Sequence, residues 1–304
     1  MTEDARQAPM PPMIIGIAST GRAETLRRVL RHMEALDPAP DKIMLSVIRP
    51  TDHEGVETAR LPLEVIVSER PGACGQRNDI LDRAPAGSIV VFFDDDFVPA
   101  PGYLGAVAAL MIARPDAAVV TGTVLADGIL GPGLTLETAE ALIAAEPQGM
   151  PSAAAAEAEP VHNGYGCNMA VRRDAAVAAG ISFDERLPLY AWLEDVDFSR
   201  RLARHGAILK SRQARGVHLG VKSGRTPGLR LGYSQVVNPL YLWRKGTLAG
   251  WRALRQVSRN IAANAWRLPR PEPWVDRAGR LRGNLLGLAH AMTGRLEPER
   301  AAGL

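Results

Sequence analysis

The chain has little cysteine and no long apolar run, and both absences limit what it can be. Its 304 residues include two cysteines, Cys74 and Cys167, which lie in different segments without a metal-type spacing. A disulfide-stapled scaffold therefore fits poorly, and we expect a reducing, cytoplasmic compartment. No apolar run approaches the ~20 residues that a membrane-spanning helix requires. Residues 1–12 carry acidic residues and prolines instead of a basic and then apolar signal, so we expect a flexible tail there.

A large excess of charge of one sign is also missing. The chain has 36 basic and 33 acidic residues, a net charge of +3, which argues against a nucleic-acid footprint over the whole surface. The apolar fraction of 46% is enough for a sizeable core. The length suits one large α/β domain with an extension, or two small domains.

Strand and helix patterns alternate along the first part of the chain. Apolar runs at 13–18, 42–48 and 63–67 predict strands, and the spacing of apolar residues over 24–36 predicts a helix. Alternation of this kind indicates a parallel sheet with right-handed crossovers, and ligands then bind above the carboxyl ends of the strands. Further along we expect helices at 78–84, 101–113, 134–145 and 173–179, and strands at 89–93, 117–124, 163–172, 207–211 and 214–219.

The sequence is organised around the acidic segment at 94–96. Five apolar residues, Ile89 to Phe93, predict a buried strand that leads directly into Asp94, Asp95 and Asp96. Three adjacent carboxylates raise each other's pKa or require a cation, and Mg²⁺ or Mn²⁺ prefers such oxygen ligands and commonly carries substrate phosphates. A solvated acidic turn is the alternative. The position at the end of a buried strand favours a metal–nucleotide site.

Two further segments have polar residues that suit a binding site. Gly72, Gly75 and Arg77 precede a predicted short helix, where backbone N–H groups and a guanidinium can face an anion. Glu194 and Asp195 lie where another helix is expected to begin. Helix capping explains one of these acids easily, but not the whole acidic cluster. The neighbouring Trp192 offers a flat face for a sugar ring, although core packing is the commoner use of tryptophan.

A glycine-containing loop with basic residues follows the last predicted strand. His218 comes first, followed by Lys222 and Arg225, a pattern that suits a lid over a diphosphate. A metal ligand and an ordinary hydrogen-bonded histidine are both open interpretations of His218.

After residue 226 the character of the sequence changes. Helical patterns at 229–244, 248–266 and 278–292 contain recurring arginines and tryptophans, with a proline-rich linker at 269–273. Such helices suit either a membrane surface with anionic lipid or an ordinary solvated face over a tryptophan-containing core. We therefore divide the chain into a flexible tail at 1–12, a nucleotide-binding domain at 13–225 and a helical extension at 226–304. The segment at 127–160 is less regular and is expected to be a mobile insertion near the substrate mouth.

With these motifs in place, the chain resembles the inverting family-2 glycosyltransferases over about residues 13–246. The resemblance is carried, in order, by residues 15–22, 75–78, 92–96, 166–168, 194–198 and 217–218. It implies the α/β nucleotide-sugar fold called GT-A, with a mainly parallel central sheet, followed here by the C-terminal helical extension. It also implies a nucleoside-diphosphate sugar donor, a saccharide or lipid-linked acceptor, and Mg²⁺ or Mn²⁺ as cofactor.

The resemblance assigns roles to individual residues of this sequence. Thr20, Arg22 and Asp52 fall where the family holds the base and ribose, and Arg77 falls near the nucleotide. Asp96 matches the cation ligand of the family's DxD motif, with Asp94 or Asp95 nearer the ribose. Asp195 matches the catalytic base, and His218 is similar to the histidine that some members use on the cation.

These assignments predict a metal-dependent, inverting transfer of a hexosyl group in polysaccharide or glycoconjugate biosynthesis. The cation on Asp96, helped by Arg225 or Lys222, would neutralise the leaving diphosphate. Asp195 would take the proton of the acceptor hydroxyl, while Glu194 binds the acceptor or fixes the loop. We expect a protein of the cytoplasm, peripheral on the inner face of the cell membrane through its C-terminal helices, with no nucleic-acid partner.

Two other functions are alternatives to this one. A nucleotidyltransferase would favour a glycine-rich loop with a lysine after the first strand, whereas Ser19 to Arg22 reads Ser-Thr-Gly-Arg with no following lysine. A non-catalytic module that binds membranes or polysaccharides would not need the acidic segments at 94–96 and 194–195 together.

Overall fold

The computed structural model describes residues 10–146, 158–223 and 226–304. Within them a nine-stranded sheet has the order β3-β2-β1-β4-β8-β6-β9-β5, and β7 pairs with β9. The strands are β1 (Met13–Ser19), β2 (Lys42–Val47), β3 (Leu63–Val67), β4 (Ile89–Asp94), β5 (Phe97–Pro99), β6 (Ala117–Asp127), β7 (Ala158–Pro160), β8 (Asn168–Arg172) and β9 (Ala207–His218).

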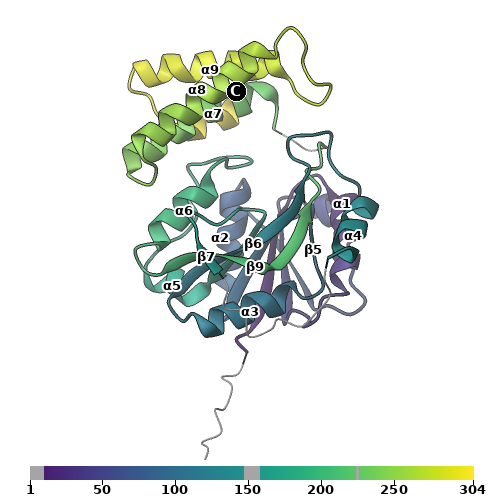
Figure 1. Ribbon diagram of the computed structural model, residues 1–304. Helices are drawn as coiled ribbons and strands as arrows, with labels where there is room; N and C mark the ends of the chain where they lie inside the picture. Colours follow the sequence, from purple (N-terminus) through teal and green to yellow (C-terminus); the bar gives the residue numbers. More distant parts are fainter. Residues whose placement is uncertain (1–9, 147–157, 224–225) are drawn as a thin grey trace, which may run out of the picture.

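Helices cover both faces of this sheet, and three more form a separate layer above it (Figure 1). The helices are α1 (Ala23–Met33), α2 (Ala73–Arg83), α3 (Tyr103–Ala113), α4 (Leu136–Ala144), α5 (Arg173–Ala178), α6 (Glu194–Leu202), α7 (Gly228–Lys245), α8 (Gly250–Trp266) and α9 (Arg277–Met292). The mixed α/β class, with a largely parallel centre and a helical C-terminal region, is confirmed.

The strands β3, β2, β1 and β4 pair in parallel, and β6 pairs in parallel with β9. Strand β8 is antiparallel to both β4 and β6, and so joins the two parallel groups. Because β1, β2 and β4 run in the same direction, the loops that follow them lie at one edge of the sheet. The acidic residues after β4 are therefore placed beside the Ser-Thr-Gly-Arg loop after β1.

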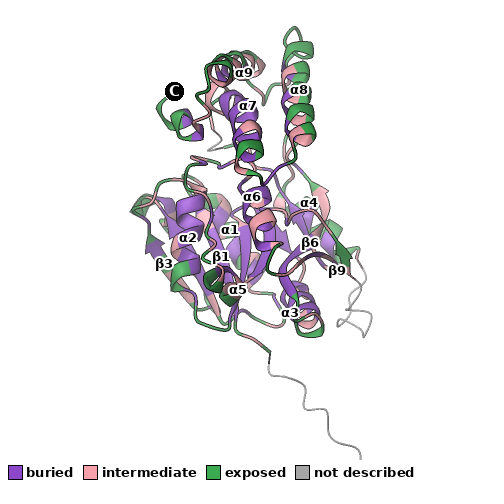
Figure 2. Ribbon diagram, turned by 90° about the vertical axis from the view of Figure 1, so that its left-hand side faces the viewer, coloured by how far each residue is buried: buried purple, intermediate pink, exposed green. Residues whose placement is uncertain are grey.

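Alternation along the strands divides the core between the two faces of the sheet. Ile15 and Ile17 of β1 pack in one apolar cluster with α1 and α3, whereas Ile14 packs in a second cluster with α2, α5 and α6. Both faces are covered, which explains why the central strands read as continuous apolar runs in the sequence. Figure 2 shows the buried residues concentrated in the sheet and the exposed ones on the outer helices.

Some element boundaries differ from the prediction. Helix α2 begins at Ala73 instead of Asn78, because Gly72 adopts φ 90° and turns the chain into the helix. The two strands expected at 207–211 and 214–219 are one strand, β9, with shifts in its register to β6. The strand expected at 163–172 is shorter, Asn168–Arg172. The residues before β8 instead form a turn that brings Gly166 into the site described below.

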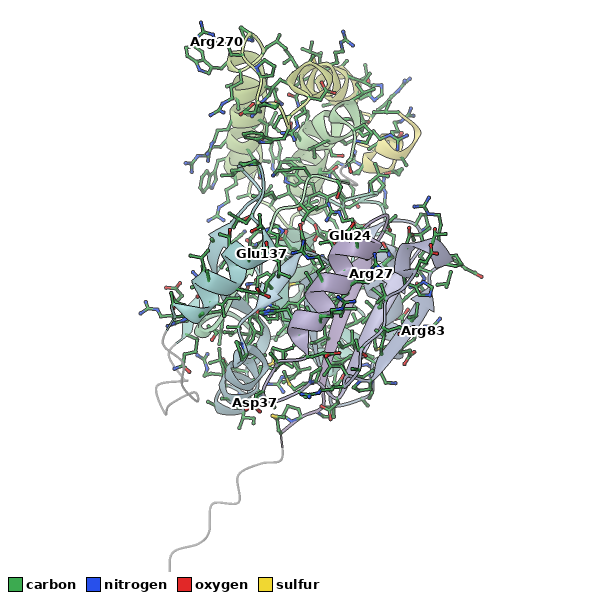
Figure 3. All side chains as sticks on the ribbon, turned by 90° about the vertical axis from the view of Figure 1, so that its right-hand side faces the viewer. Glu24, Arg27, Asp37, Arg83, Glu137 and Arg270 are labelled. Carbon is green, nitrogen blue, oxygen red and sulfur yellow. The ribbon has the colours of Figure 1, made fainter. Side chains whose placement is uncertain are left out.

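The three C-terminal helices pack closely on each other. A Cβ added at Gly232 of α7 would lie 2.1 Å from the backbone oxygen of Arg280 in α9, so only glycine allows this approach. Asn264 and Asn284 are buried between the helices and hydrogen-bonded to each other at 2.8 Å. Figure 3 shows Arg270 at the outer end of this layer, far from Asp37 at the opposite end of the molecule. No helix in the described parts of the chain is both long and apolar enough to cross a membrane.

The helical layer is attached to the sheet domain through α7. Lys245 contacts Asp184 at 2.5 Å and Asp197 of α6 at 2.8 Å, and Thr247 also donates to Asp197. Tyr241 donates a hydrogen bond to Asp184 at 2.7 Å. These contacts orient α7 against α6, whose first residues are acidic. The division at residue 225 and the tail at 1–12 stay predictions, because element positions do not show which part folds alone.

Candidate active site

The acidic residues of the first segment lie in the turn between β4 and β5. Asp94 is the last residue of β4 and is half-buried, whereas Asp95 and Asp96 are buried. The short strand β5 pairs with the end of β9, with Phe97 opposite His218. This pairing brings a histidine from a position more than a hundred residues away to the acidic turn.

Asp94, Asp96 and His218 together can hold a metal ion. One ligand atom from each lies within 4.8 Å of the other two. Nε2 of His218 lies 3.3 Å from Asp96, and Nδ1 lies 2.9 Å from Asp127 at the end of β6. The Asp127 carboxylate on Nδ1 fixes the ring with Nε2 toward the metal position, as partners of metal-binding histidines usually do. Two carboxylates and an imidazole suit Mn²⁺ or Mg²⁺.

The charges of this group act on each other. Burial lowers the pKa of His218, but hydrogen bonds to Asp127 and Asp96 and their negative charges outweigh burial and raise it to about 10. Burial raises the pKa of Asp96, yet His218, Arg22 and the backbone N–H of Val221 bring it below its ordinary value. Asp96 is therefore held ionised, as a cation ligand must be.

Asp95 faces away from His218 and toward the loop after β1. Ser19 donates to it at 2.6 Å and Arg22 at 2.9 Å. Burial raises the pKa of Asp95 more than Arg22 lowers it. Arg22 also donates to the backbone oxygen of Ser223 at 2.9 Å, and Val221 donates its N–H to Asp96 at 2.8 Å. The loop after β9 thus lies over the acidic turn.

The second acidic segment lies in the same site, because Arg77 connects the two. Its guanidinium contacts Asp94 at 2.9 Å and Glu194 at 2.5 Å, and it donates to the backbone oxygen of Gly166 at 3.0 Å. Arg77 is only 4% exposed. A Cβ on Gly166 would lie 2.8 Å from the Glu194 carboxylate, so the turn before β8 closes tightly around the pair.

Asp195 is half-buried beside this ion pair. Its carboxylate accepts hydrogen bonds from the N–H groups of Gly166 at 3.1 Å and Val196 at 2.7 Å. Burial raises the pKa values of Asp195 and Glu194 above their ordinary values; the hydrogen bonds from Gly166 and Val196 oppose the rise for Asp195, and Arg77 opposes it for Glu194. The Arg77 guanidinium contacts Asp94 and Glu194, and its charge also acts on Asp195, so three carboxylates share one positive charge. A carboxylate with a raised pKa is a stronger base.

The loop before α6 has a strained backbone. Leu189, Ala191 and Leu193 have φ values of 61°, 52° and 77°, which side-chain-bearing residues rarely adopt. Contacts from two directions hold this loop: Asn238 of α7 donates to the backbone oxygen of Trp192 at 2.9 Å, and Ala73 of α2 donates to that of Leu189 at 3.0 Å. The helical layer thereby contacts the loop that leads into Glu194 and Asp195.

The other residues assigned by resemblance lie around the same edge. Thr20 is exposed in the loop after β1. Asp52 is buried and accepts hydrogen bonds from the N–H of Gly21 and from the backbone and side chain of Arg49, so it joins the loops after β1 and β2. Lys222 donates to the backbone oxygens of Gly128 and Ile129. Trp192 is half-buried. Arg225 lies outside the described residues. The nucleotide-binding roles of these residues stay predictions.

Sequence reasoning missed Asp127 and Tyr165. Tyr165 donates to Asp127 at 2.8 Å, and its ring lies edge-on to that of His218 with centroids 6.0 Å apart. Asp127 could have been found as a carboxylate at the end of a strand, but the sequence pattern predicts that this strand ends at Val124, three residues earlier. Strand β6 in fact reaches Asp127, where it pairs with His218.

A mixed α/β sheet with a candidate Asp-x-Asp cation site at its edge is the architecture of GT-A glycosyltransferases. Residues 11–210 match the family described as "Glycosyltransferase like family 2". This match covers more than half of the chain, so the chain belongs to that family. No curated protein matches the sequence.

Solved glycosyltransferase structures have the same fold. S. aureus TarS 1-349 is 14% identical, with 95% of this chain and 89% of that chain covered and a TM-score of 0.53. The mannosyltransferase PcManGT from Pyrobaculum calidifontis, in complex with GDP-Man and Mn²⁺, is 18% identical, with 96% and 86% covered and a TM-score of 0.55. GalNAc-T7, with UDP, GalNAc and Mn²⁺, is 13% identical, with 96% and 58% covered and a TM-score of 0.57. At these identities the likeness shows the fold alone.

Proposed function

We propose that the protein is a metal-dependent, inverting glycosyltransferase that moves a hexosyl group from a nucleoside-diphosphate sugar to a saccharide or lipid-linked acceptor. The observation that carries the proposal is the position of Arg77, which contacts Asp94 of the candidate cation site and Glu194 beside Asp195. Two acidic groups with different tasks therefore lie within one side chain's reach. This is the arrangement that donor activation and acceptor deprotonation require.

Asp94, Asp96 and His218 are the residues that would hold Mg²⁺ or Mn²⁺. Their ligand atoms lie close enough for one ion, and Asp127 orients the histidine ring. Two of the structures with this fold contain Mn²⁺ and a nucleotide or nucleotide sugar, which supports the proposal. When bound, such a cation supplies positive charge for the leaving diphosphate.

Asp195 is the proposed base of the transfer step. The acceptor oxygen forms a bond to the anomeric carbon while the bond from that carbon to the diphosphate breaks, and the hydroxyl proton passes to the Asp195 carboxylate. A single displacement of this kind inverts the anomeric centre. The N–H groups of Gly166 and Val196 hold the carboxylate in one orientation. Lys222, in the loop after β9, and Arg22 lie on the donor side of the site.

We also place the protein in polysaccharide or glycoconjugate biosynthesis in the cytoplasm, peripheral on the inner face of the cell membrane. The helical layer supports a surface contact, because Trp251, Leu254 and Trp266 of α8 are 61%, 51% and 86% exposed. Exposed tryptophan and leucine beside arginine suit an interface with anionic lipid. Sedimentation with vesicles of phosphatidylglycerol and phosphatidylcholine tests this placement.

A thermal-shift screen of nucleoside diphosphates with and without Mn²⁺ tests the proposed function. A ligand that binds only the folded state raises the midpoint of unfolding. We expect one nucleoside diphosphate to raise it in the presence of Mn²⁺ and to have little effect without the ion. Transfer from the corresponding nucleotide sugar is then measured, and absence of both nucleotide binding and sugar release would contradict the proposal.

A further inference from the structure

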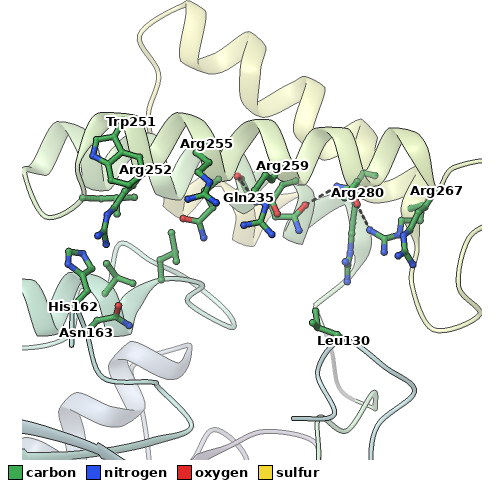
Figure 4. Close-up of a pocket in the computed structure, with 18 of the residues that line it drawn as sticks. Leu130, His162, Asn163, Gln235, Trp251, Arg252, Arg255, Arg259, Arg267 and Arg280 are labelled. Carbon is green, nitrogen blue, oxygen red and sulfur yellow. Dashed lines mark hydrogen bonds between the residues drawn. The ribbon is translucent and has the colours of Figure 1, made fainter. Parts of the chain in front are cut away.

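A large cavity separates the helical layer from the sheet domain, on the side of the loop before α6 that leads into the proposed base. Its volume is about 900 Å³, and one wall is the face of α8 that carries Arg252, Arg255 and Arg259. Figure 4 shows these side chains directed from α8 toward the sheet domain, with Arg252 above His162 and Asn163. A cavity of this size accommodates a ligand larger than a single ion or a single sugar.

The charge of the cavity wall is strongly positive. Six arginines and one acidic residue, Glu272, line it. Glu272 is occupied by ion pairs with Arg267 and with Arg277. Arg252, Arg255 and Arg259 form no ion pair with a carboxylate of the described ranges. Because Glu272 pairs with Arg267 and Arg277, the charges of Arg252, Arg255 and Arg259 repel each other, and an anionic ligand relieves that repulsion.

The positive charge beside the cavity also acts on the pKa of His162. Burial lowers its pKa, and the charges of Arg252 and Arg200 lower it further. Its Nε2 atom is buried and has no hydrogen-bond partner in the described residues. The floor of the cavity thus adds a neutral, polar ring below the row of arginines.

The cavity begins at the proposed catalytic loop. Leu193 and Val196 line it, and they flank Glu194 and Asp195 in the sequence. A ligand in the cavity therefore approaches the base from the helical layer, whereas the candidate cation site lies on the other side of Arg77. In an inverting displacement the acceptor attacks the face of the sugar opposite the leaving diphosphate, so the cavity lies on the acceptor side of the proposed base.

We propose that this cavity binds an acceptor that carries phosphate groups, with Arg252, Arg255 and Arg259 as its anion-binding row. The proposal rests on the glycosyltransferase function proposed above. The first and last of the three arginines are seven positions apart on the helix, about 10 Å at ~1.5 Å per residue, so contact with all of them requires more than one anionic group. A phosphate offers more acceptor oxygens than a carboxylate, and so accepts from several guanidinium groups at once.

Calorimetric titration of the full chain with inorganic tripolyphosphate, without added metal, tests the assignment. The double variant Arg255→Gln/Arg259→Gln should bind at least about tenfold more weakly, because it removes two cationic groups that donate charge-assisted hydrogen bonds to phosphate oxygens. Arg270→Gln/Arg282→Gln is the matched control, since both residues are exposed in the helical layer and neither lines the cavity. The control should bind like wild type. The emission of Trp251, beside Arg252, gives a second readout.

Three results would overturn the proposal. The first is equal binding by wild type and the cavity variant. The second is equal or tighter binding of polygalacturonate, which would assign the cavity to carboxylates. The third is a loss of binding to phosphatidylglycerol vesicles in the cavity variant that exceeds its loss of tripolyphosphate binding, which would assign the arginines to a membrane. Mn²⁺-dependent nucleotide binding is measured on the same samples, so failure of the proposed function is seen separately.

Discussion

Arg77 and Glu194 lie 117 positions apart in the sequence and form a buried contact with 2.5 Å between nitrogen and oxygen. The same guanidinium holds Asp94, so one side chain of α2 fixes the distance between the candidate cation site and the proposed base. Its interior position means that Arg77 acts as a positioning residue for both acids.

Replacement of Arg77 by methionine should strongly destabilise the protein at pH 9. The buried Glu194 and the half-buried Asp94 would lose their guanidinium, and removal of one partner from a buried pair costs about 3–5 kcal/mol. Urea denaturation followed by circular dichroism measures the change. Arg83→Met, at the exposed end of the same helix, is the control and should lie within about 0.5 kcal/mol of wild type. Equal stabilities of the two variants would show that the pair contributes nothing.

Glu194 should make the stability of the protein fall as pH rises. Burial raises its pKa from 4.5 to about 8 in the folded state. The folded chain therefore binds the Glu194 proton more tightly than the unfolded chain does, and this tighter binding stabilises the fold. The stabilisation is full below pH 4.5 and is lost as pH rises through about 8. Glu194→Gln removes the titration. The free energy of unfolding of both proteins is measured in urea without metal at pH 5 and pH 8.5. The value for the variant, relative to wild type, should be higher at pH 8.5 than at pH 5. An equal difference at the two pH values would contradict the raised pKa of Glu194.

Asp195→Asn should retain donor binding and lose transfer. General-base assistance contributes roughly 10²–10⁴-fold, and asparagine cannot accept the acceptor's proton. Single-turnover transfer and calorimetric titration with the nucleoside diphosphate and Mn²⁺ separate the two effects. A rate near that of wild type would remove Asp195 from the role of base, whatever its effect on binding.

Asp96→Ala should abolish the Mn²⁺-dependent part of nucleotide binding. The variant loses one carboxylate of the three-residue group and leaves His218 without its partner at 3.3 Å. Calorimetry with UDP and with GDP, each with and without Mn²⁺, measures the effect. Asp82→Ala, an exposed aspartate of α2, is the control. Undiminished Mn²⁺ dependence in Asp96→Ala would place the cation elsewhere.

Asn238→Ala should reduce kcat with little change in the KM of the donor. The hydrogen bond from Asn238 to the Trp192 carbonyl holds the strained loop before α6, and its loss should cost about 1 kcal/mol of stability. Tyr241→Phe is the control on the same helix, because it loses a hydrogen bond to Asp184 but leaves the loop contact intact. If both variants lower kcat equally, the effect is one of general stability and not of loop position.

Much of the architecture could be predicted from local sequence patterns. The apolar run Ile89–Phe93 and the spacing of Leu26, Val29, Leu30 and Met33 depend only on the period of a strand or helix, and both elements form where expected. The acidic turn at 94–96 could be predicted as a candidate cation site over a solvated acidic turn, because the three carboxylates follow a long buried strand at its carboxyl end.

Other features depend on contacts between residues that are distant in the sequence. Arg77 was expected in a loop before a helix, but Gly72 starts α2 earlier and turns the guanidinium into the interior. Asp127 reaches His218 only because β6 extends to pair with the end of β9. No local pattern records either relationship, because each is set by the packing of separate elements.

The sequence by itself determined the order of strands and helices, the acidic segments and the resemblance to a family, since these follow from periodicity and from adjacent residues. Only the tertiary structure decided that Asp94 and Glu194 share one guanidinium and that Arg252, Arg255 and Arg259 face a cavity beside the loop before α6. The physical reason is that helical spacing puts the three arginines on one face of α8, whereas the packing of α7 and α9 determines which way that face points.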